Sequence, residues 1–175
     1  MTDAVLCATT FYVVLRSTHS PLFRGAAALF SIAAFLGVLR FSGLYVNEAP
    51  HMFVSMIAGV AAFPALATSV MFPQSPITRQ WRGSWLLLLI IAAVGALIVM
   101  NSGSRLYLNG CALLAVAGIT YVSLRQRRWI RVSSATIMLI GLLCFALKFS
   151  PTTALQPADV LHLALAAGWL GLDRS

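Results

Sequence analysis

Residues 84–100 read SWLLLLIIAAVGALIVM, an almost wholly apolar run with no charged side chain. A helix needs roughly 20 apolar residues to cross a hydrocarbon core about 30 Å thick, so this stretch predicts a membrane-spanning helix. Apolar runs of similar character occupy residues 25–45, 50–72, 106–124 and 132–149, and shorter ones occupy residues 4–15 and 158–172. We therefore predict an all-α integral membrane bundle of seven transmembrane helices, with residues 1–175 forming a single multi-pass domain.

The composition supports this class and excludes others. Of the 175 residues, 60% are hydrophobic and 9% are charged, whereas a soluble domain is about 45–50% apolar and about 25% charged. The net charge of +8 resembles that of a nucleic-acid-binding domain, but the apolar content excludes a soluble DNA- or RNA-binding domain. We therefore expect membrane lipids, and no nucleic acid, as partners.

The distribution of basic residues predicts the orientation of the bundle. With seven spans, one side holds Arg16, Arg24, Arg79, Arg82, Arg125, Arg127, Arg128, Arg131 and Arg174. The other side holds Arg40, Arg105 and Lys148. Because Lys and Arg are enriched on the cytoplasmic side, we predict a plasma (inner) membrane protein with its N-terminus outside and its C-terminus in the cytoplasm. We expect Trp81, Trp85, Trp129 and Trp169 to lie at the inner boundary as interfacial anchors.

Two acid–histidine pairs fall on the predicted outer side. Glu48 precedes His51 by three residues, and Asp159 precedes His162 by three residues. On a helix such a spacing puts both side chains on one face, and acid-x-x-His pairs supply metal ligands in helical bundles. We therefore predict a metal site of Glu48, His51, Asp159 and His162, with zinc or another transition metal. Pro50 favours the first helical position, which places Glu48 before its helix.

The same residues admit other interpretations. Asp159 is favoured near a helix N-terminus by the helix dipole alone, and Glu48 can simply pair with Arg40. His51 and His162 are alternatively axial haem ligands, with Arg40, Arg105 and Lys148 neutralising the propionates. A small-solute transporter would use a polar path past Arg40, Asn109 and Lys148.

Four further features carry structural expectations. Pro64 is expected to kink the helix predicted for residues 50–72. Cys7, Cys111 and Cys144 form no recognisable motif and are expected to act as small buried hydrophobes. His19 lies in a predicted inner loop and is expected to be solvated. The basic run at residues 125–131 is expected to determine topology, with attraction of anionic lipid headgroups as the alternative.

The arrangement resembles the alkaline-ceramidase-like (CREST) superfamily of seven-helix membrane hydrolases. The resemblance lies in the short-looped helices, Ser42 on the second, His51 opening the third, and Asp159 and His162 on the seventh. It implies a zinc-dependent amidase or lipid-hydrolase site in which Ser42, His51 and His162 match family positions, and Asp159 stands in for a second histidine.

These observations give an ordered set of functions. The first is a small multi-pass membrane protein with a polar ligand- or metal-binding cluster, acting as a binding protein or as a subunit of a membrane complex or homo-oligomer. The alternative is a metal-dependent membrane hydrolase acting on a lipid or amide through His51, Asp159, His162 and Ser42. A small-solute transporter or haem-binding membrane protein is the third.

Overall fold

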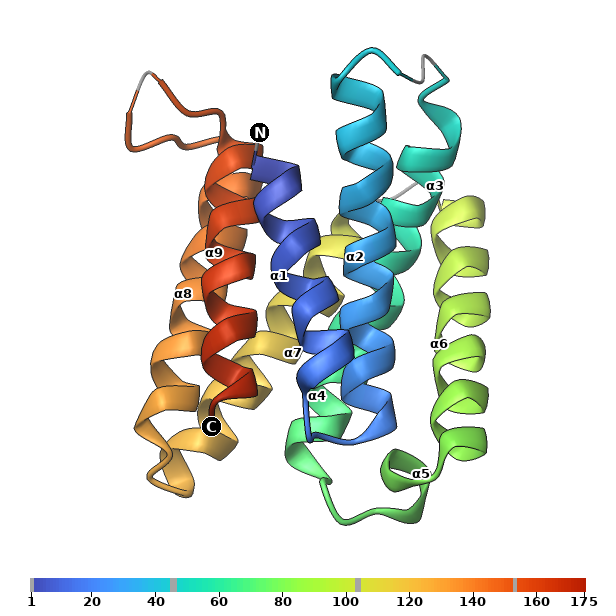
Figure 1. Cartoon of the computed structure of the whole chain (residues 1–175), viewed down its shortest axis with the longest axis vertical. Coiled ribbons are helices and arrows are strands. Elements are labelled where there is room, and N and C mark those ends of the chain that lie inside the picture. The colour runs from blue at the N-terminus through green and yellow to red at the C-terminus, as the bar shows by residue number, and fades with distance from the viewer. Residues whose placement is uncertain (1, 45–46, 103–104, 153) are drawn as a thin grey trace.

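The computed structural model describes residues 2–44, 47–102, 105–152 and 154–175, and the side chains of residues 102, 105 and 106 lie outside this description. The described residues contain helices and turns but no strand, which confirms the all-α class (Figure 1). The elements are α1 (Thr2–Arg16), α2 (Pro21–Phe41), α3 (Ala49–Ile57), the π-helical η1 (Ala58–Ala62), α4 (Phe63–Met71), α5 (Pro76–Arg79), α6 (Trp81–Ser102), α7 (Arg105–Arg125), α8 (Trp129–Ala146) and α9 (Pro157–Asp173).

Within the described residues, five helical segments are long and apolar enough to cross a membrane. They are Pro21–Phe41, Ala49–Met71, Trp81–Asn101, Tyr107–Arg125 and Trp129–Ala146. The other long helices are shorter, with 15 residues in α1 and 17 in α9. Helices occur in all seven predicted ranges, and the four-residue α5 is an addition that the apolar pattern did not predict.

The segment Ala49–Met71 is not one regular helix. A π-helical turn, Ala58–Ala62, separates α3 from α4 immediately before Pro64. Proline has no N–H to donate to the carbonyl of residue 60, and its ring clashes with that carbonyl, so the backbone widens at this point. The irregularity predicted for Pro64 is therefore present as a π-helical turn.

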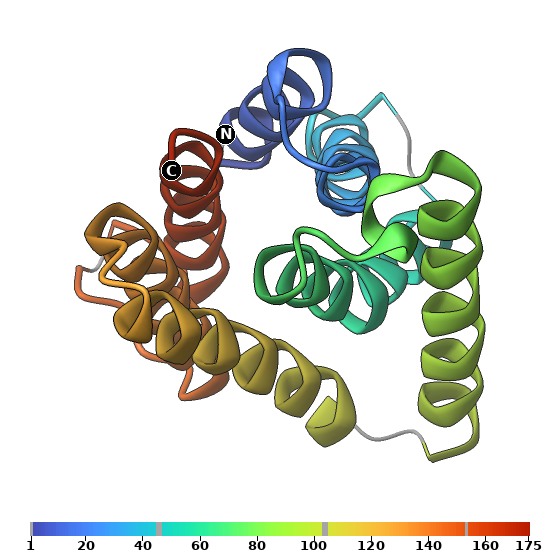
Figure 2. The same ribbon diagram turned by 90° about the horizontal axis from the view of Figure 1, so that it is seen from below.

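The helices surround the α3–η1–α4 segment. Seen from below, α2, α6 and α7 lie around it, while α8 and α9 complete the opposite side with α1 (Figure 2). Helix α9 packs on both α8 and α1. At Gly168, an added Cβ would collide with the Met138 side chain of α8, so the absence of a side chain permits this close contact.

Trp169 is a core residue, which makes its predicted role as an interfacial anchor wrong. Its side chain is fully buried, and its ring makes edge contacts with Phe23 and Phe30. Trp81 and Trp129 are exposed, as anchors would be. The prediction rested on the position of Trp169 along its helix, which sets its depth in the membrane. The rotation of α9 about its own axis is a separate property, and it turns Trp169 toward α2.

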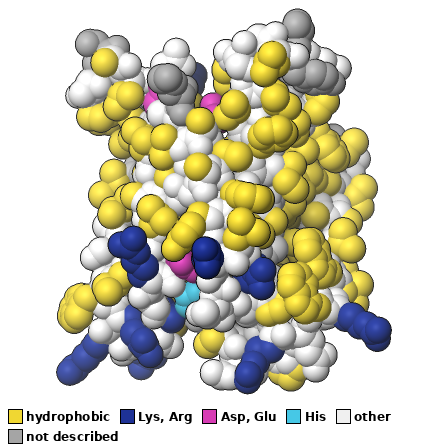
Figure 3. Space-filling view, viewed as in Figure 1, with side chains coloured by type: hydrophobic (Ala, Val, Ile, Leu, Met, Phe, Trp, Pro, Cys, Tyr) yellow, Lys and Arg dark blue, Asp and Glu magenta, His cyan; other side chains and the backbone are white. Residues whose placement is uncertain are grey.

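The two ends of the bundle differ in charge. The N-terminal end holds the start of α1, the end of α2 and the start of α9, and the C-terminal end holds the α1–α2, α4–α6 and α7–α8 turns (Figure 1). Lys and Arg side chains gather toward the C-terminal end, and hydrophobic side chains cover most of the middle (Figure 3). On α6, Leu86, Leu89 and Leu97 are exposed in this middle zone. An apolar belt with a basic end matches the surface of a membrane-spanning bundle.

Candidate functional site

The first and last helices meet in a polar contact at the N-terminal end of the bundle. Asp3, in the first turn of α1, is buried, and its Oδ1 lies 3.3 Å from Nδ1 of His162 on α9. Thr2 Oγ1 lies 3.5 Å from the same Nδ1 atom. An ionised carboxylate only accepts hydrogen bonds, so His162 donates through Nδ1 and its Nε2 is left as an acceptor in the neutral imidazole.

His51 reaches the same place from α3. A Cβ atom built on Gly37 of α2 would lie 2.7 Å from Asp3 Oδ1 and 3.2 Å from His51 Nε2. Both side chains therefore occupy the space that the missing side chain of Gly37 leaves open. Together with His162, they form what we call the Asp3–His51–His162 cluster, which joins α1, α2, α3 and α9.

Arg40 determines which nitrogen of His51 carries the proton. Its Nη1 lies 3.4 Å from His51 Nδ1, and its Nη2 donates to Glu48 Oε2 at 2.5 Å. A guanidinium only donates, so Nδ1 accepts and the proton of the neutral ring sits on Nε2, facing Gly37. A metal-bound imidazole normally donates its other N–H to an acceptor, and Arg40 offers no acceptor to His51 Nδ1. The Arg40 contact therefore favours His51 Nε2 as a hydrogen-bond donor.

The four predicted metal ligands are not assembled into one group. Glu48 precedes the first helical residue of α3, as expected from Pro50, and its side chain pairs with Arg40. Asp159 accepts from Thr2 Oγ1 at 2.6 Å through Oδ1, and from the Gln156 backbone N–H at 3.0 Å through Oδ2. This capping box satisfies the first turn of α9. Among the described residues, no group of three or more His, Cys, Asp or Glu side chains has the geometry to hold a metal ion.

A small cavity adjoins the cluster. It has a volume of about 200 Å³ and is lined by Asp3, Ala4, Val38, Phe41 and Ser42. Ser42, a predicted catalytic residue, is the C-cap of α2 and donates from Oγ to the Leu39 carbonyl at 3.1 Å. The cavity thus presents one carboxylate and one hydroxyl beside an aromatic ring.

The remaining predicted residues lie apart or outside the description. The side chain of Arg105 is outside the described residues. Lys148 follows α8 with φ of 53° and is exposed. Asn109 is half-buried in α7. The cysteines are half-buried and free, and Cys7 Sγ lies 3.9 Å from Ser31 Oγ.

Two important residues were missing from the predicted site. Asp3 is the only acid of the first helix and opens it on the predicted outer side, but its partner could not be identified from spacing. Gly37 carried no signal beyond close helix packing.

His19, predicted to be solvated, is instead half-buried, with Nε2 3.2 Å from the Asp173 carbonyl and its ring 4.6 Å from that of Phe23.

The fold and the cluster define an all-α protein with membrane-length helices and a polar site joining its first and last helices. The chain belongs to a family of unknown function (DUF6962), whose model matches residues 1–174. Searches of curated proteins and of solved structures gave no significant match.

Proposed function

We propose that this protein is a multi-pass plasma-membrane protein that binds a small hydroxyl-bearing molecule at the Asp3–His51–His162 cluster. In this proposal α1 and α9 also span, giving seven spans with the N-terminus outside. The basic C-terminal end supports a cytoplasmic location for that end (Figure 3). Tilt, or local thinning of the bilayer, would allow helices of 15 and 17 residues to span.

One observation carries the choice of ligand: Asp3 Oδ1 and His51 Nε2 meet over Gly37 beside the small cavity. A carboxylate accepts a hydrogen bond, and His51 Nε2 donates one. A hydroxyl group can do both at once, because it is a donor as well as an acceptor. The Phe41 ring and Val38 would cover the apolar part of the molecule. A cavity of about 200 Å³ limits the bound portion to a few heavy atoms.

The test is to identify what the purified protein carries. The full chain in lipid nanodiscs would be denatured, the released molecules identified by mass spectrometry, and the metal content measured on the same sample. We expect a hydroxyl-bearing molecule from the unmodified protein and its loss from Asp3→Asn and His162→Ala. Arg82→Gln, at the opposite end of the bundle, is the control. Release of the same molecules in equal amounts from all four proteins would reject the proposal.

A metal-dependent membrane hydrolase acting on a lipid or amide is the second candidate. It is favoured by the Asp3–His162 contact, because a carboxylate that accepts from one imidazole nitrogen orients the other for a metal or for proton transfer. Ser42 and Asp3 also line one cavity. Here we expect close to one transition metal per chain, lost in His162→Ala, and amide or ester hydrolysis that is lost in Ser42→Ala. A metal-free unmodified protein would exclude this candidate.

A further inference from the structure

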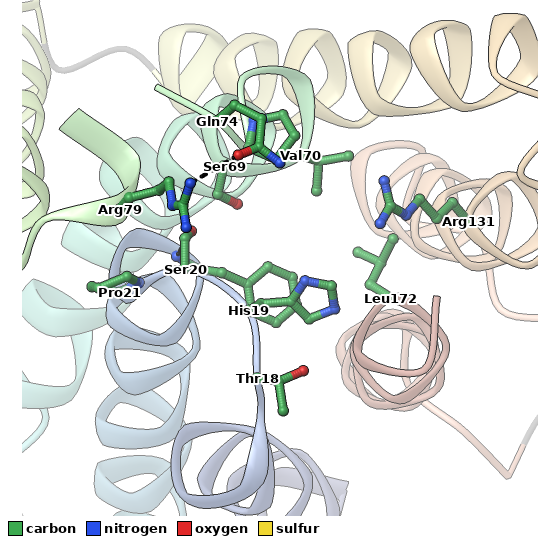
Figure 4. A pocket seen from close by; sticks show the side chains of 12 residues that line it. Thr18, His19, Ser20, Pro21, Ser69, Val70, Gln74, Arg79, Arg131 and Leu172 are labelled. Carbon is green, nitrogen blue, oxygen red and sulfur yellow. Dashed lines mark hydrogen bonds between the residues drawn. The ribbon is translucent and has the colours of Figure 1, made fainter. Parts of the chain in front are cut away.

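A second cavity lies at the opposite, C-terminal end of the bundle, far from the Asp3–His51–His162 cluster. Its volume is about 340 Å³, and its lining comes from the α1–α2 turn, the ends of α4, α5 and α9, the turn before α5, and the starts of α2 and α8. The side chains that matter for ligand chemistry are His19, Ser20, Gln74, Arg79 and Arg131 (Figure 4).

The cavity is positively charged. Arg79 and Arg131 lie on opposite sides of it in the view of Figure 4, with His19 between them. No Asp or Glu occurs among the described lining residues. Asp173 is the nearest acid along α9, but it contributes its backbone carbonyl to His19 and does not line the cavity.

No Asp or Glu side chain holds the two guanidinium groups. Arg79 Nη1 donates to the Gln74 side-chain oxygen at 3.0 Å. Arg131 donates from Nε to Ser175 Oγ at 3.0 Å and from Nη2 to the Ser175 backbone oxygen at 3.1 Å. Neither arginine pairs with an Asp or Glu side chain within the described residues. Both guanidinium groups thus line the cavity, and no Asp or Glu side chain lines it with them.

We propose that this cavity binds a phosphate group between Arg79 and Arg131. Guanidinium groups match phosphate oxygens in charge and in fork-shaped geometry. His19 Nε2 donates to the Asp173 carbonyl, so Nδ1 of the neutral ring is an acceptor and the two arginines supply the donors for the phosphate oxygens. The phosphate belongs either to an anionic lipid headgroup at the membrane surface or to a soluble phosphate ester. This site is independent of the function proposed for the N-terminal end.

The experiment measures binding of two probes to the full chain in phosphatidylcholine nanodiscs. One probe is phosphatidylglycerol incorporated into the disc, and the other is glycerol 3-phosphate added to the buffer. We expect affinity for at least one probe to fall about tenfold or more in the double variant Arg79→Gln, Arg131→Gln. Binding of phosphatidylglycerol alone identifies a lipid site, and binding of glycerol 3-phosphate identifies a soluble ester.

Arg82→Gln is the matched control, because Arg82 lies at the same end of the bundle but does not line the cavity. We expect this variant to bind the probes about as well as the unmodified protein. Equal losses in Arg82→Gln and the double variant would reduce the effect to general surface charge and overturn the proposal, as would unchanged binding in the double variant. If the double variant does not fold, Arg79→Lys and Arg131→Lys keep the charge but lose the fork geometry. Unchanged affinity in both would then overturn it.

Discussion

The Asp3 carboxylate on the first helix lies 3.3 Å from Nδ1 of His162 on the last helix, so these two helices are joined by a largely buried polar contact. The contact fixes α1 against α9 where Gly37 of α2 leaves room for it. Its consequences for stability can be measured directly.

Asp3→Asn removes the charge that accepts from His162. The pair is largely shielded from solvent, so we expect the free energy of unfolding to fall by about 1–3 kcal/mol. Glu48→Gln breaks the more exposed Arg40–Glu48 pair and should change it by about 1 kcal/mol or less. Unfolding of both variants in the same detergent checks this. Equal effects would show that Asp3 makes no special contribution.

Gly37→Ala places a methyl group 2.7 Å from Asp3 Oδ1 and 3.2 Å from His51 Nε2. Both side chains must move, so we expect a loss of about 1–3 kcal/mol in stability together with weaker ligand retention. Gly110→Ala is the control, because its added Cβ meets nothing within 4 Å. Thermal unfolding and released-ligand analysis should separate the two variants. A tolerated Gly37→Ala with full retention would contradict the proposed geometry.

Trp169→Ala should be far more damaging than the same change at Trp129. Trp169 of α9 is fully buried and packs against Phe23 of α2. Removing a large core side chain costs about 3–5 kcal/mol. Trp129 is exposed, so its replacement should cost about 0.5 kcal/mol or less. Chemical denaturation of both variants provides the comparison. Similar midpoints would place Trp169 at the surface after all.

The orientation can be tested by labelling single cysteines in a background without Cys7, Cys111 and Cys144. A cysteine at residue 127, in the turn between α7 and α8, should react with an impermeant reagent only from the cytoplasmic side. A cysteine at residue 152, in the turn between α8 and α9, should react only from outside. The reverse pattern would invert the proposed topology.

Features that depend on local sequence were predictable. Pro50 lies at the start of α3 and leaves Glu48 outside the helix, and Pro64 follows the π-helical turn, because proline acts on its own neighbouring backbone. The Arg40–Glu48 pair was among the expected alternatives, since both residues flank one short turn. The four-residue metal set was a weaker inference, because it required two distant pairs to face each other.

The amino-acid sequence by itself determined the helical class, the places where helices start and stop, and the separation of basic residues to one end. Each of these depends on runs of neighbouring residues and on the free energy of placing them in apolar surroundings. Tertiary structure alone decided that Asp3 meets His162, that Gly37 makes space for them, and that Trp169 turns inward. In helices that are apolar on nearly all sides, the hydrophobic pattern does not specify which face packs inward. Side-chain fit between neighbouring helices therefore sets their rotation, and that rotation creates the site.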